Sequence, residues 1–110
     1  MRTDAALSML SLAAKAGKIK SGEYAVEKAV KTGNARLVIV AGDASEATRK
    51  SYRDMCRYHD VDYMEYADKT TLGRTIGKEF RAAVAVCDEG FSAGIAKQAG
   101  RAPASTTEVD

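Results

Sequence analysis

Two continuous apolar runs constrain the fold of this chain more than any other feature. They are LVIVA at 37–41 and AAVAVC at 82–87, and each has the length of a strand. A strand that is apolar on both faces has to be covered on both faces, which requires helices above and below one sheet. We therefore expect a sheet in the middle of the molecule.

Helical patterns alternate with these runs and with two weaker strands. The expected elements are helix 5–16 ended by Gly17, strand 18–20, a helix from Ser21 to Gly33, strand 37–41, a helix from Asp43 to His59, strand 61–66, a helix from Asp68 to Ile76 ended by Gly77, strand 82–87 and a helix from Asp88 that fades by Gly100. The helix caps are expected at Thr3 or Asp4, Ser21, Asp43 (with Glu46 three residues on), Asp68 and Asp88. This order predicts an α/β protein, a three-layer α/β/α sandwich with a central mixed sheet of about four strands.

The chain of 110 residues is long enough for one domain and too short for two. We expect residues 1–99 to form a single domain, and residues 100–110, with the one proline and no apolar cluster, to be a disordered tail. No apolar run approaches the roughly 20 residues of a membrane span, and the first residues lack the basic start of a signal peptide. The expected location is the cytoplasm, where Cys56 and Cys87 are free thiols.

The composition contains no motif that indicates an enzyme. His59 is the single histidine, and no P-loop, zinc-ligand or serine-hydrolase motif occurs. We expect no catalytic residue, no metal site and no cofactor.

The net charge of +2 conceals a segregation along the chain. Residues 1–36 hold seven basic and three acidic side chains, and residues 69–81 hold four basic and one acidic. Residues 43–68 hold four basic and seven acidic. If the two basic segments meet in space, one end of the domain is positive and suits a polyanion, and otherwise the charges form a solvated mixture.

Three turns are candidates for a binding site. In the first, at 18–23, Gly22 would let a ligand backbone come close and the free N–H groups of a helix start would favour a phosphate; an ordinary capped helix start is the alternative. In the second, at 41–45, Asp43 would cap a helix, and Gly42 would admit a nucleotide base. In the third, at 77–81, Phe80 would stack on a base or pack into the core; we expect it to be partly exposed.

Several strings together resemble a known family. They are LSMLSLAAKAGK from Leu7, SGE at 21–23, KAV at 28–30, LVIVAGDAS at 37–45, LGRTIGK at 72–78 and VAVCDEGF at 84–91. The combination is similar to the YlxQ-like bacterial branch of the kink-turn-binding ribosomal protein superfamily, over roughly residues 4–99. The resemblance implies an α/β/α sandwich that binds RNA, often on the ribosome, without catalysing a reaction.

The resemblance also implies roles for the three turns. Gly22 matches the family's glycine beside the kinked phosphates, Lys28 its helix lysine and Asp43 its acidic turn residue. Archaeal and eukaryotic members carry Asn-Glu where this chain has Tyr24 and Ala25, so the need for a kink stays open while RNA binding is still expected. The candidate RNA-binding residues are Lys18, Lys20, Ser21, Gly22, Glu23, Lys28, Lys31, Gly42, Asp43, Lys78, Phe80 and Arg81.

The sequence thus predicts a monomeric RNA-binding protein whose partners are structured RNA, ribosomal RNA foremost, and the ribosome, with no membrane. One alternative is a protein-interaction adaptor that uses the acidic segment 43–68 as its contact surface. Another is the RNA-recruiting domain of a methyltransferase, against which the short chain argues because no cofactor-binding domain follows.

Overall fold

The computed structural model describes residues 4–100, and its order of helices and strands confirms the predicted alternation. The elements are α1 (Ala5–Lys15), β1 (Ile19–Ser21), α2 (Glu23–Lys31), β2 (Leu37–Val40), α3 (Glu46–His59), β3 (Asp62–Glu65), α4 (Lys69–Thr75), β4 (Ala83–Val86) and α5 (Glu89–Gln98). Of the expected tail at 100–110, residues 101–110 lie outside the described residues, as does the possible cap at Thr3. No helix in the part that is described is long and apolar enough to cross a membrane.

The four strands form one mixed sheet in the order β1-β4-β2-β3. β4 runs antiparallel to both of its neighbours, whereas β2 and β3 are parallel. The two apolar runs of the sequence are the central strands, and every residue of β2 and β4 is buried. The predicted mixed sheet of four strands is thereby confirmed.

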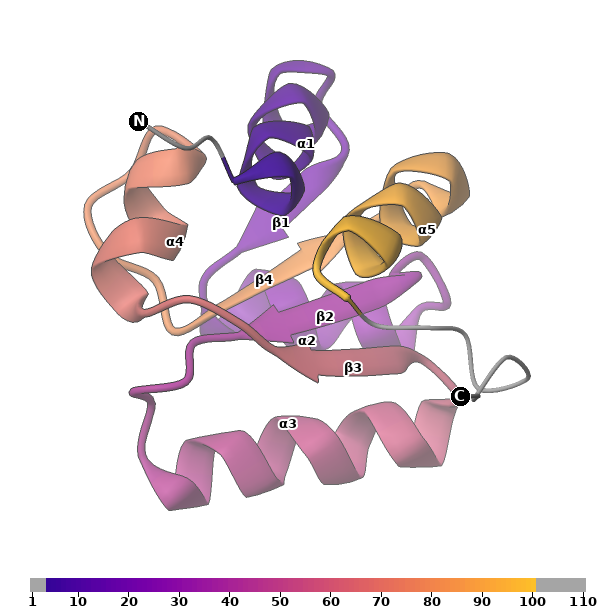
Figure 1. The fold of residues 1–110 in the computed structure, drawn as a ribbon. Coiled ribbons are helices and arrows are strands. Elements are labelled where there is room, and N and C mark those ends of the chain that lie inside the picture. Colours follow the sequence, from indigo (N-terminus) through magenta and orange to yellow (C-terminus); the bar gives the residue numbers. More distant parts are fainter. Residues whose placement is uncertain (1–3, 101–110) are drawn as a thin grey trace.

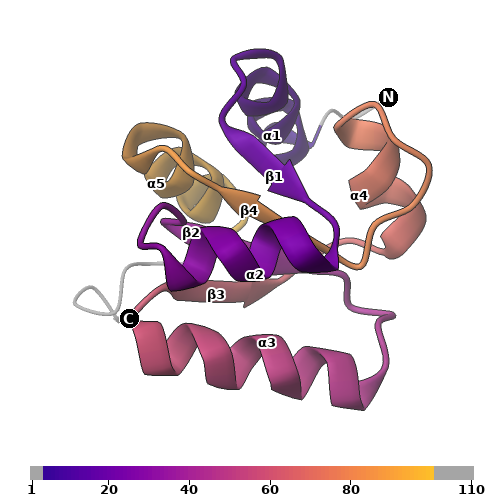
Figure 2. The same ribbon diagram turned by 180° about the vertical axis from the view of Figure 1, so that it is seen from behind.

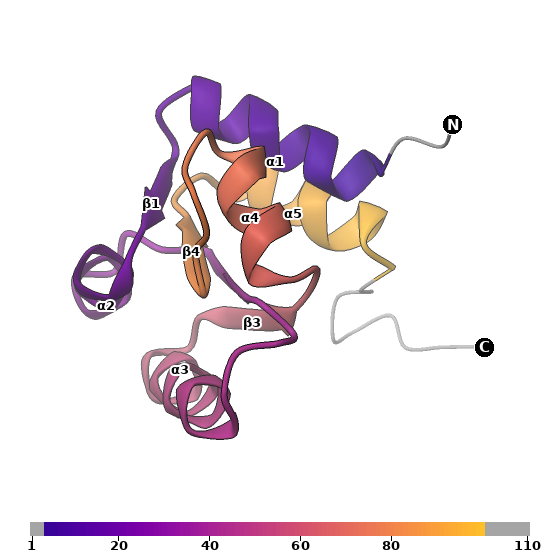
Figure 3. The same ribbon diagram turned by 90° about the vertical axis from the view of Figure 1, so that its left-hand side faces the viewer.

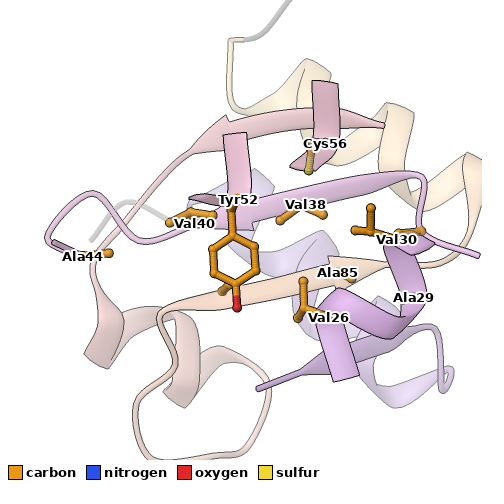
Figure 4. Packing of buried hydrophobic residues seen from close by; sticks show 11 residues of the cluster. Val26, Ala29, Val30, Val38, Val40, Ala44, Tyr52, Cys56 and Ala85 are labelled. Atoms are coloured by element: carbon orange, nitrogen blue, oxygen red, sulfur yellow. The ribbon is translucent and has the colours of Figure 1, made fainter. Parts of the chain in front are cut away.

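Helices cover both faces of the sheet, which confirms the three-layer sandwich. α2 and α3 lie side by side on one face, and α1, α4 and α5 cover the other (Figures 1 and 2). Successive side chains of a strand point to opposite faces. Val38 and Val40 of β2 therefore pack toward α2 and α3, while Leu37 and Ile39 pack toward the other three helices. Figure 4 shows the first of these two cores.

Three of the predicted helix caps are confirmed and two are wrong. Asp4, Asp68 and Asp88 each accept a hydrogen bond from a backbone N–H three residues on. Ser21 is not a cap because it pairs with Val84 as the last residue of β1, and Gly22 stands at the N-cap of α2.

The cap predicted at Asp43 belongs instead to Ser45. The chain makes one more turn after β2, in which the N–H of Ala44 donates to the carbonyl of Ala41 at 3.0 Å. Helix α3 consequently starts at Glu46, and the hydroxyl of Ser45 accepts from the N–H of Thr48 at 3.1 Å. This displacement frees the Asp43 carboxylate for another partner.

A glycine inside α4 allows the next loop to lie against the helix. A Cβ atom on Gly73 would come within 1.9 Å of the carbonyl oxygen of Glu79 and 2.5 Å of the Cα of Phe80. The carbonyl of Gly73 also accepts a hydrogen bond from Lys78 N–H at 2.8 Å. The loop before β4 is therefore held on the backbone of α4 itself.

Gly73→Ala should lower the melting temperature, although the same change inside an ordinary exposed helix stabilises by about 1 kcal/mol. The new methyl group has to displace a backbone carbonyl, and overpacking of this kind costs roughly 1–3 kcal/mol. Gly90→Ala is the matched control, because a Cβ on that α5 residue meets a single atom at 3.4 Å, an ordinary contact. Thermal unfolding of both variants tests this. Equal melting temperatures would show that the loop does not lie on Gly73.

Candidate nucleic-acid interface

The turns at 41–45 and 77–81 and the last residues of the first candidate turn, from Ser21 on, lie at one edge of the sheet. Ser21 and Val40, which end β1 and β2, pair with Val84 and Ala83 at the start of β4. β3 ends at the same edge, because Val40 is also in register with Glu65. The N-termini of α2, α3 and α4 therefore begin here, with the loop 76–82 among them; we call this the strand-end edge, and Figure 3 looks onto it.

A continuous set of hydrogen bonds joins the three turns. The Arg81 guanidinium Nε donates to the Ser21 hydroxyl at 3.3 Å. The Arg81 backbone N–H donates to the Lys69 carbonyl at 3.0 Å, and the Lys69 N–H donates to Asp43 Oδ1 at 2.9 Å. Segments that are 60 and 26 residues apart in the chain thus form one surface.

The loop before β4 presents an aromatic ring to solvent. The side chain of Phe80 is 56% exposed, which confirms the predicted partial exposure. Arg81 Nη1 donates to the carbonyl of Phe80 at 2.9 Å, so the guanidinium lies against the same backbone. Lys78 is exposed beside them. The loop offers a flat apolar face next to two cations.

The turn into α2 needs glycine for its backbone conformation. Gly22 has φ +94°, where an L side chain is strained, and a Cβ there would meet no atom within 4 Å. Glycine is thus required by the backbone, while the space above it is open. The first N–H groups of α2 carry the partial positive charge of a helix start toward that space.

Helix α2 divides its polar side chains between two neighbouring stripes. Tyr24 and Lys28 are four residues apart, share one face and are both exposed, Tyr24 by 77%. Glu23 and Glu27 form the second stripe and line a groove against α3. The ammonium nitrogen of Lys31, Nζ, lies 2.6 Å from Glu27 Oε2, so this predicted site residue is held in an ion pair.

Two other predicted residues lie away from the strand-end edge. Lys18 precedes β1 at the opposite end of the sheet, where its carbonyl accepts from the N–H of Cys87 at 2.8 Å. Lys20 is exposed in the middle of β1, opposite Ala85. Burial raises the pKa of the Cys87 thiol, and the positive charges of Lys20 and Arg36 oppose that rise.

The basic side chains of segment 69–81 are free of ion pairs within residues 4–100. They are Lys69, Arg74, Lys78 and Arg81. The arginines of α3 differ, since Arg49 and Arg53 both contact Glu46 and Glu65. Basic side chains without an ion-pair partner are available to an anionic ligand, whereas Arg49 and Arg53 of α3 already contact carboxylates.

Sequence reasoning missed three residues of this edge. Lys69 links two of the turns through its backbone, which no side-chain pattern could reveal. Gly73 could have been found, because a glycine inside a helix costs stability unless a close approach requires it. Tyr24 departs from the family's Asn-Glu pattern, and its exposed ring in the first turn of α2 is available for stacking.

Among residues 4–100, no three histidine, cysteine, aspartate or glutamate side chains are grouped so that they could hold a metal ion. Asp68 is the N-cap of α4. Hydrogen bonds from the backbone N–H and the hydroxyl of Thr71 hold the pKa of its carboxyl below the ordinary value. The arrangement is suited to binding an anionic, partly unstacked ligand.

Comparison with known proteins identifies the family. The model of the ribosomal protein L7Ae/L30e/S12e/Gadd45 family matches residues 4–96. The chain belongs to this family. RNA-binding protein YlxQ of Bacillus subtilis (strain 168) is 44% identical over 84 residues, which are 76% of this chain and 84% of that protein. Large ribosomal subunit protein eL8 of Picrophilus torridus is 32% identical over 87 residues, or 78% of this chain and 68% of that protein.

Solved structures share the fold of this L7Ae-family chain. A protein of unknown function from Bacillus halodurans C superposes with a TM-score of 0.86 at 36% identity, covering 90% of this chain and all of that one. The Giardia lamblia 15.5kD RNA binding protein superposes with a TM-score of 0.72 at 25% identity, covering 86% and 81%. The resemblance seen in the sequence, and the fold it implied, are confirmed.

Asp43→Ala should destabilise this L7Ae-family protein by about 1 kcal/mol, the usual cost of removing a side-chain acceptor from a helix N-terminus. The N–H of Lys69 would lose its partner, and the turn after β2 would be released from α4. Asp43→Asn keeps the acceptor oxygen and should retain most of the stability. Denaturant unfolding of the two variants distinguishes them. Equal losses would show that the hydrogen bond across the edge contributes nothing.

Proposed function

We propose that this chain is a non-catalytic RNA-binding protein that holds structured RNA against the strand-end edge. The observation that carries the proposal is the junction of three helix starts with the basic segment 69–81 and two exposed aromatic rings, those of Tyr24 and Phe80. The names of its relatives support it, since YlxQ and the Giardia protein are described as RNA-binding and eL8 as ribosomal.

The residues of the edge divide the work of binding between charge and stacking. Phosphates approach the open space over Gly22, where helix α2 begins, and Lys28, Lys78 and Arg81 neutralise them. Unpaired bases stack on Phe80 and on Tyr24, since any base offers a flat π face to an aromatic ring. Gly42 and Asp43 are exposed in the turn after β2, where Asp43 accepts from the N–H of Lys69 and Gly42 leaves room for a base.

The acidic segment 43–68 gives less support to an adaptor. Glu46, Asp54 and Glu65 are in ion pairs with basic residues of α3, and Asp43 and Asp68 accept backbone N–H groups. A continuous acidic face therefore does not form from this segment, and RNA binding is the better-supported function.

We further propose that the preferred RNA contains a kink-turn, that it is ribosomal RNA, and that the protein acts in the cytoplasm as a monomer. A kinked RNA backbone presents closely spaced phosphates, and such phosphates could contact the neighbouring turns of the strand-end edge together. A test compares one RNA helix carrying a kink-turn with a helix of equal length in which Watson–Crick pairs replace the sheared G·A pairs. Equal affinity would reject the kink while leaving RNA binding in place.

Phe80→Ala should weaken RNA binding by about 1–3 kcal/mol, the usual value of one base stacked on an aromatic ring. Its melting temperature should change little, because more than half of the side chain is exposed. Tyr58→Ala is the matched control: Tyr58 is 85% exposed and lies at the far end of α3, about 20 Å from the edge. Affinity and thermal unfolding are measured together, and equal affinities for the two variants would remove the loop from the site.

Lys28→Ala should lower RNA affinity and reduce the slope of log affinity against log salt by about one unit, because one phosphate contact is lost. Lys50→Ala serves as the control, since Lys50 is paired with Asp54 on α3 at 2.7 Å. Arg81 is unsuitable for this comparison because its guanidinium also holds Ser21. Filter binding at several salt concentrations gives both slopes. An unchanged slope for Lys28→Ala would place the phosphates elsewhere.

A further inference from the structure

A groove between α2 and α3 lies beside the proposed RNA surface and has a different chemistry. It encloses about 240 Å³, and Figure 2 shows the two helices that form its walls. The lining residues are Glu23, Glu27, Ala47, Thr48, Ser51, Tyr52 and Met55. No basic side chain is among them, so the groove repels the phosphates that the neighbouring edge attracts.

The hydroxyl of Tyr52 reaches this groove without a hydrogen-bond partner. Tyr52 is 6% exposed, and in residues 4–100 its hydroxyl neither donates nor accepts a hydrogen bond. Figure 4 shows its ring extending from α3 past Val40, with the oxygen toward Val26 of α2. A polar group in a largely buried side chain is unfavourable without a hydrogen-bond partner, so this oxygen is suited to a ligand.

Two carboxylates face the same space. Burial first, and then the charges of Glu23 and Glu27, raise the pKa of Tyr52 to about 12, so its hydroxyl stays protonated and neutral at physiological pH. Glu27 contacts Lys31, whereas Glu23 forms no ion pair within the described chain. One carboxylate thus stands uncompensated beside a hydroxyl that lacks a partner.

We propose that this groove binds a cation on an aliphatic stem, an alkylammonium or alkylguanidinium group. The charged end lies between Glu23 and Glu27 and donates a hydrogen bond to the Tyr52 oxygen. The stem packs on Met55 and Ala47, which form the apolar part of the groove. The site differs from the proposed RNA surface in ligand and in location. Its test therefore does not depend on the proposed function.

Titration of the purified full chain with agmatine, which carries both cationic groups on a butyl stem, tests the site. Calorimetry should detect binding that weakens as salt is raised, since exposed charges are screened. Glu23→Gln should weaken agmatine binding about tenfold or more, because a hydrogen bond to a charged group contributes about 1.5–3 kcal/mol. Asp54→Asn, which removes one negative charge from α3 outside the groove, should bind as the unmodified chain does.

Tyr52→Phe separates a ligand contact from a purely structural residue. Without agmatine the variant should be at least as stable as the unmodified chain, because the unpartnered hydroxyl is removed and the packed ring is kept. With agmatine it should show less of the rise in melting temperature that a ligand of the native state produces. A lower melting temperature without ligand, or an undiminished rise with it, would overturn the role assigned to the hydroxyl.

The source of the cation is decided by two further probes. Spermidine represents a free polyamine, and a blocked Gly-Arg-Gly peptide represents a basic side chain of a protein. Tighter binding of spermidine assigns the groove to a small molecule, and tighter binding of the peptide assigns it to a protein partner. Failure of all three probes to bind, or equal agmatine affinity for Glu23→Gln and the unmodified chain, would overturn the proposal.

Discussion

The direction of β4 is the constraint on which the rest of the structure depends. β4 pairs antiparallel with both β1 and β2, so it begins where those two strands end. The loop before it must therefore return along α4 to the strand-end edge, and that path requires Gly73. The contacts of Arg81 with Ser21 and Lys69 follow from the same geometry. A parallel β4 would have placed this loop at the opposite edge, away from the other two turns.

The charged side chains of this protein group by where they meet on the folded surface, not by the segment of the chain that carries them. The segment with an acidic excess contains a helix whose arginines neutralise the surrounding carboxylates, Glu46 and Glu65 among them. The segment with a basic excess supplies Glu23 and Glu27 to an acidic groove. Because side chains from distant segments meet in the fold, charge summed along the chain describes neither surface.

Helix α2 connects the two proposed sites. Its Tyr24–Lys28 stripe belongs to the proposed RNA surface, and its Glu23–Glu27 stripe lines the groove against α3. A rotation of about 100° per residue is enough to give adjacent residues such different surroundings. One short helix can therefore serve an anionic ligand and a cationic ligand at the same time.

Local patterns in the sequence were sufficient to predict the architecture. Two apolar runs predicted the central strands, glycines after helical patterns predicted the helix ends, and three of five caps were right, because each of these depends on nearest neighbours along the chain. Asp43 and Ser21 were assigned wrongly because their partners, Lys69 and Arg81, are distant in sequence. The residue types of the candidate site could likewise be read from the turns. Only the tertiary structure decided which of them meet. It places Arg81 against Ser21 and leaves Lys18 at the far end, since strand order and direction are settled by packing across the sheet.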